Sequence, residues 1–125
     1  MLWKIVNDWR AQQGLNPTVQ YTSAHYDYDV IRAVHNAQHY DQYKKSDQHD
    51  GADYSELEVI VHQATPQQMA QEAFNAFVYN DASANYAHRE HLKKPKLRAI
   101  GIGLATSYYN DYYKNGVSFI VSANI

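Results

Sequence analysis

The strongest constraint on the fold is a short run near the C-terminus, where Ile100, Ile102 and Leu104 alternate with Gly101 and Gly103. Alternation with a period of two is typical of a β-strand, because successive side chains point to opposite faces of a sheet. This strand would carry one large apolar face and one bare face. Glycines inside a strand usually mark the close approach of another backbone. We therefore expect a helix to pack directly on the bare face.

Two further strands are predicted. The run Leu57–Val61 is short and β-prone, and Val117–Val121 is a second apolar strand near the C-terminus. The connection 107–116 is rich in Tyr and Asn, and its Asn115-Gly116 pair is a typical turn signal. The two C-terminal strands should therefore form an antiparallel pair.

The remaining segments are mostly helical. We predict helices over residues 2–13, 23–43, 66–80 and 84–93. The third has a defined start: Thr65 is a suitable N-cap, Pro66 fits the first turn and Gln68 completes a capping box. Helices followed by an antiparallel strand pair indicate the α+β class, with helices covering a small sheet.

Length and composition exclude several classes of protein. The 125 residues, 45% of them hydrophobic, suit a single domain spanning 1–125. A net charge of −2 without a long run of Lys or Arg argues against general nucleic-acid binding. No segment has the roughly 18 apolar residues of a membrane span. The absence of cysteine excludes disulfides, thiol catalysis and cysteine-based zinc sites. No signal peptide opens the chain, so a secreted form would be a trimmed domain.

Several segments match the motifs of one family in their order along the chain. Val6–Leu15 reads like its opening helix, N..R...GL.P, and Pro17 completes this motif. His49-Asp50-Gly51 followed by Leu57–Ile60 matches a loop histidine and a GEN(I/L) strand, although Leu57 and Val59 replace the usual Gly and Asn. The later matches are Tyr86–Leu92 with HR.NLL, Ile100–Gly103 with iGvG, and Val117–Ala123 with the closing strand. The chain thus resembles bacterial members of the CAP superfamily (cysteine-rich secretory proteins, antigen 5 and pathogenesis-related 1 proteins).

This resemblance implies an α-β-α sandwich, in which a small central antiparallel sheet is flanked by helices and carries a shallow cleft. It also implies a secreted or cell-surface location, as is usual for bacterial members. The lack of cysteine fits the disulfide-poor secreted proteins of Gram-positive bacteria.

In the family, two histidines and one or two glutamates line the cleft and can hold a divalent ion. The positions that match here are His49, Glu58 and His88. Imidazole and carboxylate ligands suit zinc or another divalent metal such as copper or nickel, with water completing the shell. The alternative is that His49 is a solvated loop histidine and Glu58 an ordinary surface carboxylate. The second family glutamate has no clear counterpart, and three residues remain candidates: Asp81, Glu72 and Glu90.

The other histidines give weaker signals. His35 and His39 are four residues apart on a predicted helix, a spacing that permits a metal clip. Asn36 stands where a His-Glu-x-x-His protease carries its glutamate, so a solvated helix face is the simpler interpretation. His91 is expected to cap the end of its helix.

Three functions follow from these expectations. The leading one is an extracellular binding module that uses the cleft for a divalent metal, and the cleft or a Tyr-rich surface for a protein, lipid or cell-wall ligand. That surface would consist of four residues in the 107–116 segment: Tyr108, Tyr109, Tyr112 and Tyr113. The alternative is a metal-dependent hydrolase of peptides or cell-wall material with Glu58 as general base. A structural surface domain with a vestigial cleft is the third.

Overall fold

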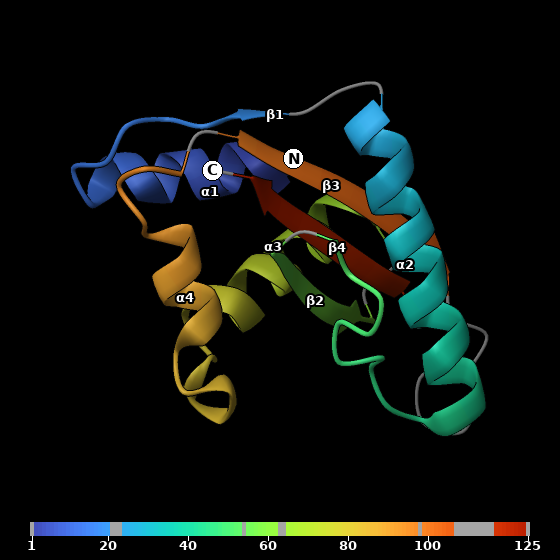
Figure 1. Cartoon of the computed structure of the whole chain (residues 1–125). Coiled ribbons are helices and arrows are strands. Elements are labelled where there is room, and N and C mark those ends of the chain that lie inside the picture. The colour runs from blue at the N-terminus through green and yellow to red at the C-terminus, as the bar shows by residue number, and fades with distance from the viewer. Residues whose placement is uncertain are drawn as a thin grey trace.

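The computed structural model describes residues 2–20, 24–53, 55–62, 65–97, 99–106 and 117–124. The elements follow one another as in Figure 1: α1 (Leu2–Gln12), β1 (Val19–Gln20), α2 (Ala24–Tyr43), β2 (Glu56–Val61), α3 (Pro66–Val78), a 3-10 helix (Ala82–Ala84), α4 (Ala87–Leu92), β3 (Ala99–Thr106) and β4 (Val117–Asn124). This mixture confirms the predicted α+β class. The Tyr-rich segment 107–116 and its predicted turn lie outside the described residues.

The strands form one four-stranded sheet in the order β1-β3-β4-β2. β3 and β4 are antiparallel, with Ile102 opposite Val121, which confirms the predicted C-terminal pair. β2 is antiparallel to β4 and forms the edge of the sheet. β1 runs parallel to β3 and was not predicted, because two residues are too few to show alternation.

The bare face of β3 is covered by α2, as expected from its glycines. A Cβ atom built on Gly101 would lie 1.9 Å from Asp29 Oδ2, and one built on Gly103 would lie 2.1 Å from the Asp29 carbonyl oxygen. Such distances are far inside van der Waals contact, so only glycine allows the helix backbone this close. The glycines therefore set the distance between α2 and the sheet, and with it the position of the polar side chains on α2.

The opposite face of β3 carries the hydrophobic core. Ile100 is fully buried and Ile102 packs against the same cluster. α1 and α3 supply most of the other members, among them Trp9 and Phe74, whose rings meet edge to face at 6.1 Å between centroids. Such aromatic contacts contribute about 0.5–1.5 kcal/mol beyond burial of their area.

The N..R...GL.P motif links α1 to α4. Arg10 is completely buried, and its guanidinium donates to the carbonyl oxygens of Asn16 (2.9 Å), Leu92 (2.8 Å) and Lys94 (3.0 Å). Leu92 is the last residue of α4, where helical carbonyls lack partners within the helix, and Lys94 follows two residues later. Arg10 therefore fixes the position of α4 and of the residues that this helix carries.

The predicted helix 84–93 is wrong at its start. Asn85 and Tyr86 have φ angles of 53° and 62°, in the left-handed region that a right-handed helix does not use. They separate the 3-10 helix from α4. The predicted start of α3 is confirmed, since Thr65 Oγ1 accepts a hydrogen bond from Gln68 N (3.2 Å).

Candidate metal-binding cleft

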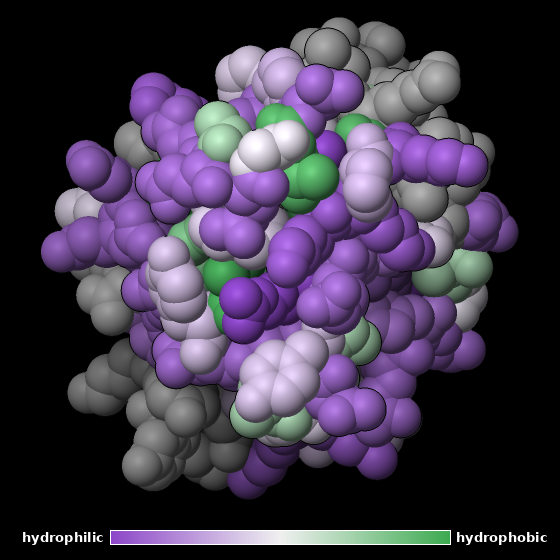
Figure 2. Space-filling model, turned by 90° about the vertical axis from the view of Figure 1, so that its left-hand side faces the viewer, coloured by the Kyte–Doolittle hydropathy of each residue, from purple (hydrophilic) through white to green (hydrophobic). Residues whose placement is uncertain are grey.

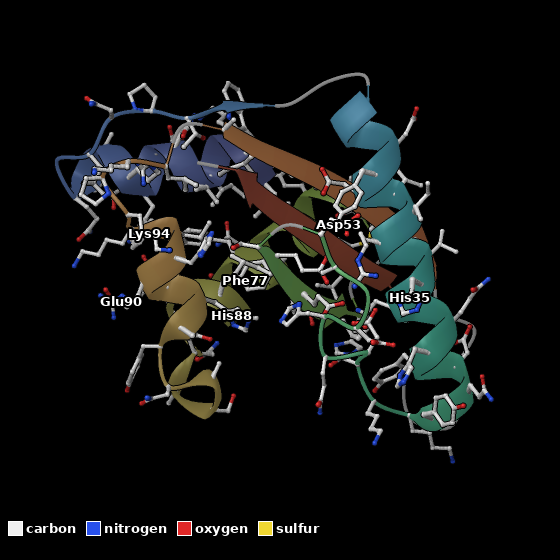
Figure 3. The ribbon with its side chains drawn as sticks, viewed as in Figure 1. His35, Asp53, Phe77, His88, Glu90 and Lys94 are labelled. Carbon is white, nitrogen blue, oxygen red and sulfur yellow. The ribbon has the colours of Figure 1, made fainter. Side chains whose placement is uncertain are left out.

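A cleft of about 580 Å³ opens between the start of β2 and the beginning of α4. The loop before β2 contributes His49, β2 contributes Glu56, and α4 contributes His88 and His91. The two histidines from the family motifs therefore line one cleft, although 39 positions separate them in the sequence. In Figure 3, His88 lies on the side of α4 that faces β2.

The wall formed by β2 and its preceding loop holds a compact group of ligand atoms. One ligand atom each from His49, Glu56 and Glu58 lies within 4.8 Å of the other two. His49 Nδ1 is 3.1 Å from Glu56 Oε1 and 2.9 Å from Glu58 Oε1. Glu56 was not predicted from the sequence, although its spacing of two residues from Glu58 places both on the same face of a strand. His88 lies outside this three-residue group.

The loop that carries His49 has an unusual backbone. Gln48 and His49 have φ angles of 53° and 66°, which is uncommon for residues other than glycine. The conformation is held by carboxylates, because the His49 N–H donates to Asp47 Oδ1 (3.0 Å) and to Glu58 Oε1 (3.0 Å). Backbone strain of this kind concentrates at functional sites.

Behind this group, Arg32 of α2 connects the loop to the strand. Its guanidinium donates to both oxygens of Glu56, at 3.0 and 2.7 Å, and to the Asp50 carbonyl at 2.8 Å. It also lies 3.4 Å from Asp47 Oδ2. The side chains of Asp47 and Glu56 are fully buried, so these carboxylates depend on Arg32 for compensation of their charge.

The ionisable side chains of this group shift one another's pKa values. Hydrogen bonds that His49 donates to the Glu56 and Glu58 carboxylates raise its pKa to about 10, so the imidazole is protonated near neutral pH. Burial would raise the pKa of Glu56, but the bonds from His49 and Arg32 outweigh it and the pKa is lowered. Burial raises the pKa of Glu58 above its usual range, and the nearby carboxyl of Asp47 adds to this rise.

On the other wall, His88 is held from behind by a carboxylate. Its Nδ1 lies 2.8 Å from Oδ1 of Asp81, whose side chain is almost fully buried. Asp81 Oδ2 also accepts the Arg89 N–H (3.0 Å), so one carboxylate orients both the imidazole and the first turn of α4. Phe77 packs against the ring at 5.2 Å between centroids. An imidazole bound at Nδ1 in this way carries its available lone pair on Nε2.

The structure separates the three candidates for the additional acidic residue. Asp81 contacts His88 directly. Glu72 instead pairs with His62 at 2.8 Å, outside the cleft. Glu90 projects from the side of α4 that faces away from β2 (Figure 3).

The predicted helical pair His35 and His39 has two separate partners. His35 Nδ1 contacts Asp47 Oδ2 at 2.5 Å, whereas His39 Nδ1 lies 3.0 Å from the Lys45 carbonyl. Neither belongs to the ligand group found among the described residues. His91 lines the cleft rather than marking only the end of its helix.

Comparison with known proteins identifies the family of this chain. The family model of the cysteine-rich secretory protein family, CAP, matches residues 3–124. The match spans nearly the whole chain, so this chain belongs to the CAP family. No curated protein matches it. Within the described residues, none of the helices has the length and apolar character required to cross a membrane.

Proposed function

We propose that this chain is a secreted or cell-surface CAP module whose cleft binds a divalent metal ion, zinc being the best fit. The observation that carries the proposal is the convergence of His49, Glu56 and Glu58 within 4.8 Å. His88 of the facing wall is the fourth candidate ligand, in the same cleft. The extracellular location is supported by the family of secretory proteins to which the chain belongs.

The spacing of the donors suits a small divalent ion. Zinc binds imidazole nitrogen and carboxylate oxygen at about 2.0–2.2 Å, which places neighbouring ligands of a tetrahedral shell about 3.4 Å apart. The His49 nitrogen lies 3.1 and 2.9 Å from the two carboxylate oxygens. The two carboxylate oxygens would therefore need to move only a few tenths of an ångström away from the His49 nitrogen to make room for the ion.

The charge of the group supports the same conclusion. Three carboxyl groups, those of Asp47, Glu56 and Glu58, surround one guanidinium and the His49 imidazolium. Because a metal ligand must be deprotonated, an ion that binds here displaces the His49 proton and supplies positive charge in its place. The buried carboxylates remain compensated in both states.

The surface around α1 and α4 favours a polar partner over an extended apolar ligand. Figure 2 shows this side of the molecule as largely hydrophilic, with small and separate apolar spots. Lipid-binding surfaces usually present a continuous apolar patch. The Tyr-rich segment predicted as a ligand face lies outside the described residues.

Calorimetric titration of zinc into metal-free protein tests the proposal. The native protein should bind one zinc ion, and His49→Ala should reduce the affinity at least about tenfold, the loss typical even for residues that only orient metal ligands. His39→Ala is the matched control, because His39 lies on α2 outside the cleft and contacts a backbone carbonyl. Equal zinc affinity in the two variants would contradict the proposal.

A metal-dependent hydrolase is the second candidate, favoured by the pairing of His88 with Asp81. A buried carboxylate on Nδ1 prepares the imidazole to accept a proton at Nε2. In this candidate His88 and Glu58, whose pKa is raised by burial, would serve as general bases instead of ligands. A metal held by His49 and Glu56 would then polarise a substrate carbonyl. Hydrolysis of a casein substrate that is lost in both His88→Ala and Glu58→Gln would support this activity. Turnover unchanged in both variants would exclude these roles.

A further inference from the structure

Among the described residues, β2 is paired along only one of its two edges. The order β1-β3-β4-β2 pairs β2 with β4 on one side and with no described strand on the other. Such an edge presents backbone N–H and C=O groups to which an added strand can bind. This edge faces α3. His62 directly follows β2, and its N–H donates to Glu72 Oε2 of α3 (2.8 Å). Backbone groups alternate between the two edges of a strand, so those of Ile60 point the same way.

A second groove, of about 550 Å³, lies along this edge. β2 and the residue after it contribute Ile60 and His62, and the facing wall is α3. That wall, together with the residues just after α3, carries four carboxamide side chains: Gln68, Gln71, Asn75 and Asn80. Each offers two N–H donors and one carbonyl acceptor. Among these four side chains, the one hydrogen bond described joins Gln71 Nε2 to Asn75 Oδ1 (2.9 Å), so most of this bonding capacity remains available to a ligand in the groove.

The groove is electrically balanced and only slightly apolar. Its carboxylate and its imidazole pair with each other, since Glu72 Oε1 lies 2.8 Å from His62 Nδ1. Among the described lining residues, Ile60 and Ala76 are the apolar ones. The described lining offers neither a free positive charge for a phosphate nor a continuous apolar surface for a lipid tail. A ligand with repeating neutral amide groups matches the groove better, because its amides can form hydrogen bonds both with the strand edge and with the carboxamide side chains.

The groove and the cleft lie at the two ends of the same strand. Glu56, at the start of β2, lines the cleft, whereas Ile60 and His62 line the groove. At about 3.3 Å per residue, this stretch of strand is about 20 Å long. On the facing wall, Asn80 lines the groove, and the next residue, Asp81, holds the α4 histidine of the cleft.

We propose that the groove binds an extended peptide of about six residues, which adds as a strand to the free edge of β2 and runs into the cleft. Peptides with small neutral side chains fit best, because Ile60 and Ala76 offer shallow apolar contacts and the charged residues of the described lining pair with each other. A peptide is thereby assigned as the ligand class of the module. Its arrival at a metal site rests on the proposed function, whereas its binding in the groove does not.

Nuclear magnetic resonance on the ¹⁵N-labelled protein, in the presence of EDTA, tests the proposal. The probe is a mixture of acetylated hexapeptides randomised over Ala, Ser, Thr, Val and Gln. We expect shifts at the Ile60 amide and at the carboxamide groups of α3. The double variant Gln71→Ala/Asn75→Ala should weaken binding about tenfold, as expected from the loss of two hydrogen-bonding side chains. Gln67→Ala, exposed on α3 outside the groove, should bind as the native protein does.

Two further probes identify the binding mode. The same hexapeptides N-methylated at alternate residues keep their side chains but lose the donors for one strand edge, so their binding should be abolished. Retained binding of the methylated peptides would overturn strand addition. Binding of chitohexaose in the groove without any binding of the hexapeptides would overturn the peptide assignment in favour of a glycan.

The outcome separates this inference from the proposed function. Hexapeptides that fail to bind a protein with an intact zinc site would refute the groove assignment alone. Hexapeptides that bind in the groove of a protein without zinc affinity would support the groove and refute the metal cleft.

Discussion

Replacing Arg32 by methionine removes the positive charge on which the buried carboxylates depend. The side chain of Arg32 is 6% exposed and those of Asp47 and Glu56 are 0% exposed. The substitution deletes both bonds to Glu56 and the bond to the Asp50 carbonyl. Breaking a buried ion pair by removing one partner costs about 3–5 kcal/mol. Arg32→Met should therefore lower the free energy of unfolding by about 3–5 kcal/mol at pH 7, where both carboxylates would otherwise be ionised.

Urea unfolding followed by far-ultraviolet circular dichroism measures this change. Lys4→Met is the matched control, because Lys4 pairs with Asp8 at 2.7 Å while the two side chains are 75% and 60% exposed. An exposed pair of this kind contributes less than about 0.5 kcal/mol. Saturating zinc should stabilise Arg32→Met more than the native protein, since the ion restores positive charge beside Glu56. A loss for Arg32→Met no larger than that for Lys4→Met would refute the role of Arg32.

Three further predictions concern the sheet and the cleft. Gly103→Ala should lower the free energy of unfolding by about 3 kcal/mol, because its Cβ would lie 2.1 Å from the backbone of α2. In Gly14→Ala nothing lies within 4 Å of the new Cβ, so the loss should be only the cost of about 1–2 kcal/mol for an alanine at φ 74°. Equal losses for the two variants would contradict this. The pKa of His49 is raised from 6.5 to about 10, so its stabilisation of the metal-free fold is complete below pH 6.5 and is lost as the pH rises through 10. After allowance for its 44% exposed side chain, unfolding curves should show a loss of about 1–2 kcal/mol that is absent in His49→Gln. Asp81→Asn should weaken zinc binding about tenfold, because His88 loses its anionic partner; unchanged affinity would show that His88 is not a ligand.

Local sequence signals predicted most of the fold. The glycines of β3 indicated a closely packed backbone, and α2 provides it at Asp29. Thr65 marked the start of α3 because its capping bond lies within four residues of chain. The two-residue strand β1 gave no such signal, since its pairing with β3 depends on residues 80 positions away. Left-handed residues other than glycine, as at Tyr86, follow from tertiary contacts that local propensity does not contain.

The candidate site was predicted only in part. The family motifs pointed to His49 and His88, and the fold places both in one cleft. They did not point to Glu56 or to its partner Arg32, which lies 24 residues away on a different element. The pairing of His88 with Asp81 could also not be inferred, because it depends on the turn that separates α3 from α4. Buried charges find their partners through tertiary packing, which spacing along the chain does not encode.

The central claim is that a divalent ion replaces the proton that His49 shares with Glu56 and Glu58. Zinc titrations by calorimetry, repeated in buffers of different ionisation enthalpy, measure the number of protons released on binding. The pKa of His49 near 10 predicts about one proton per zinc at pH 7–8. The number should grow as the pH falls, because the raised pKa of Glu58 lets this carboxylate take up a proton earlier than an ordinary glutamate does. One-to-one zinc binding without proton release at pH 7, or with release unchanged in His49→Ala, would contradict the claim.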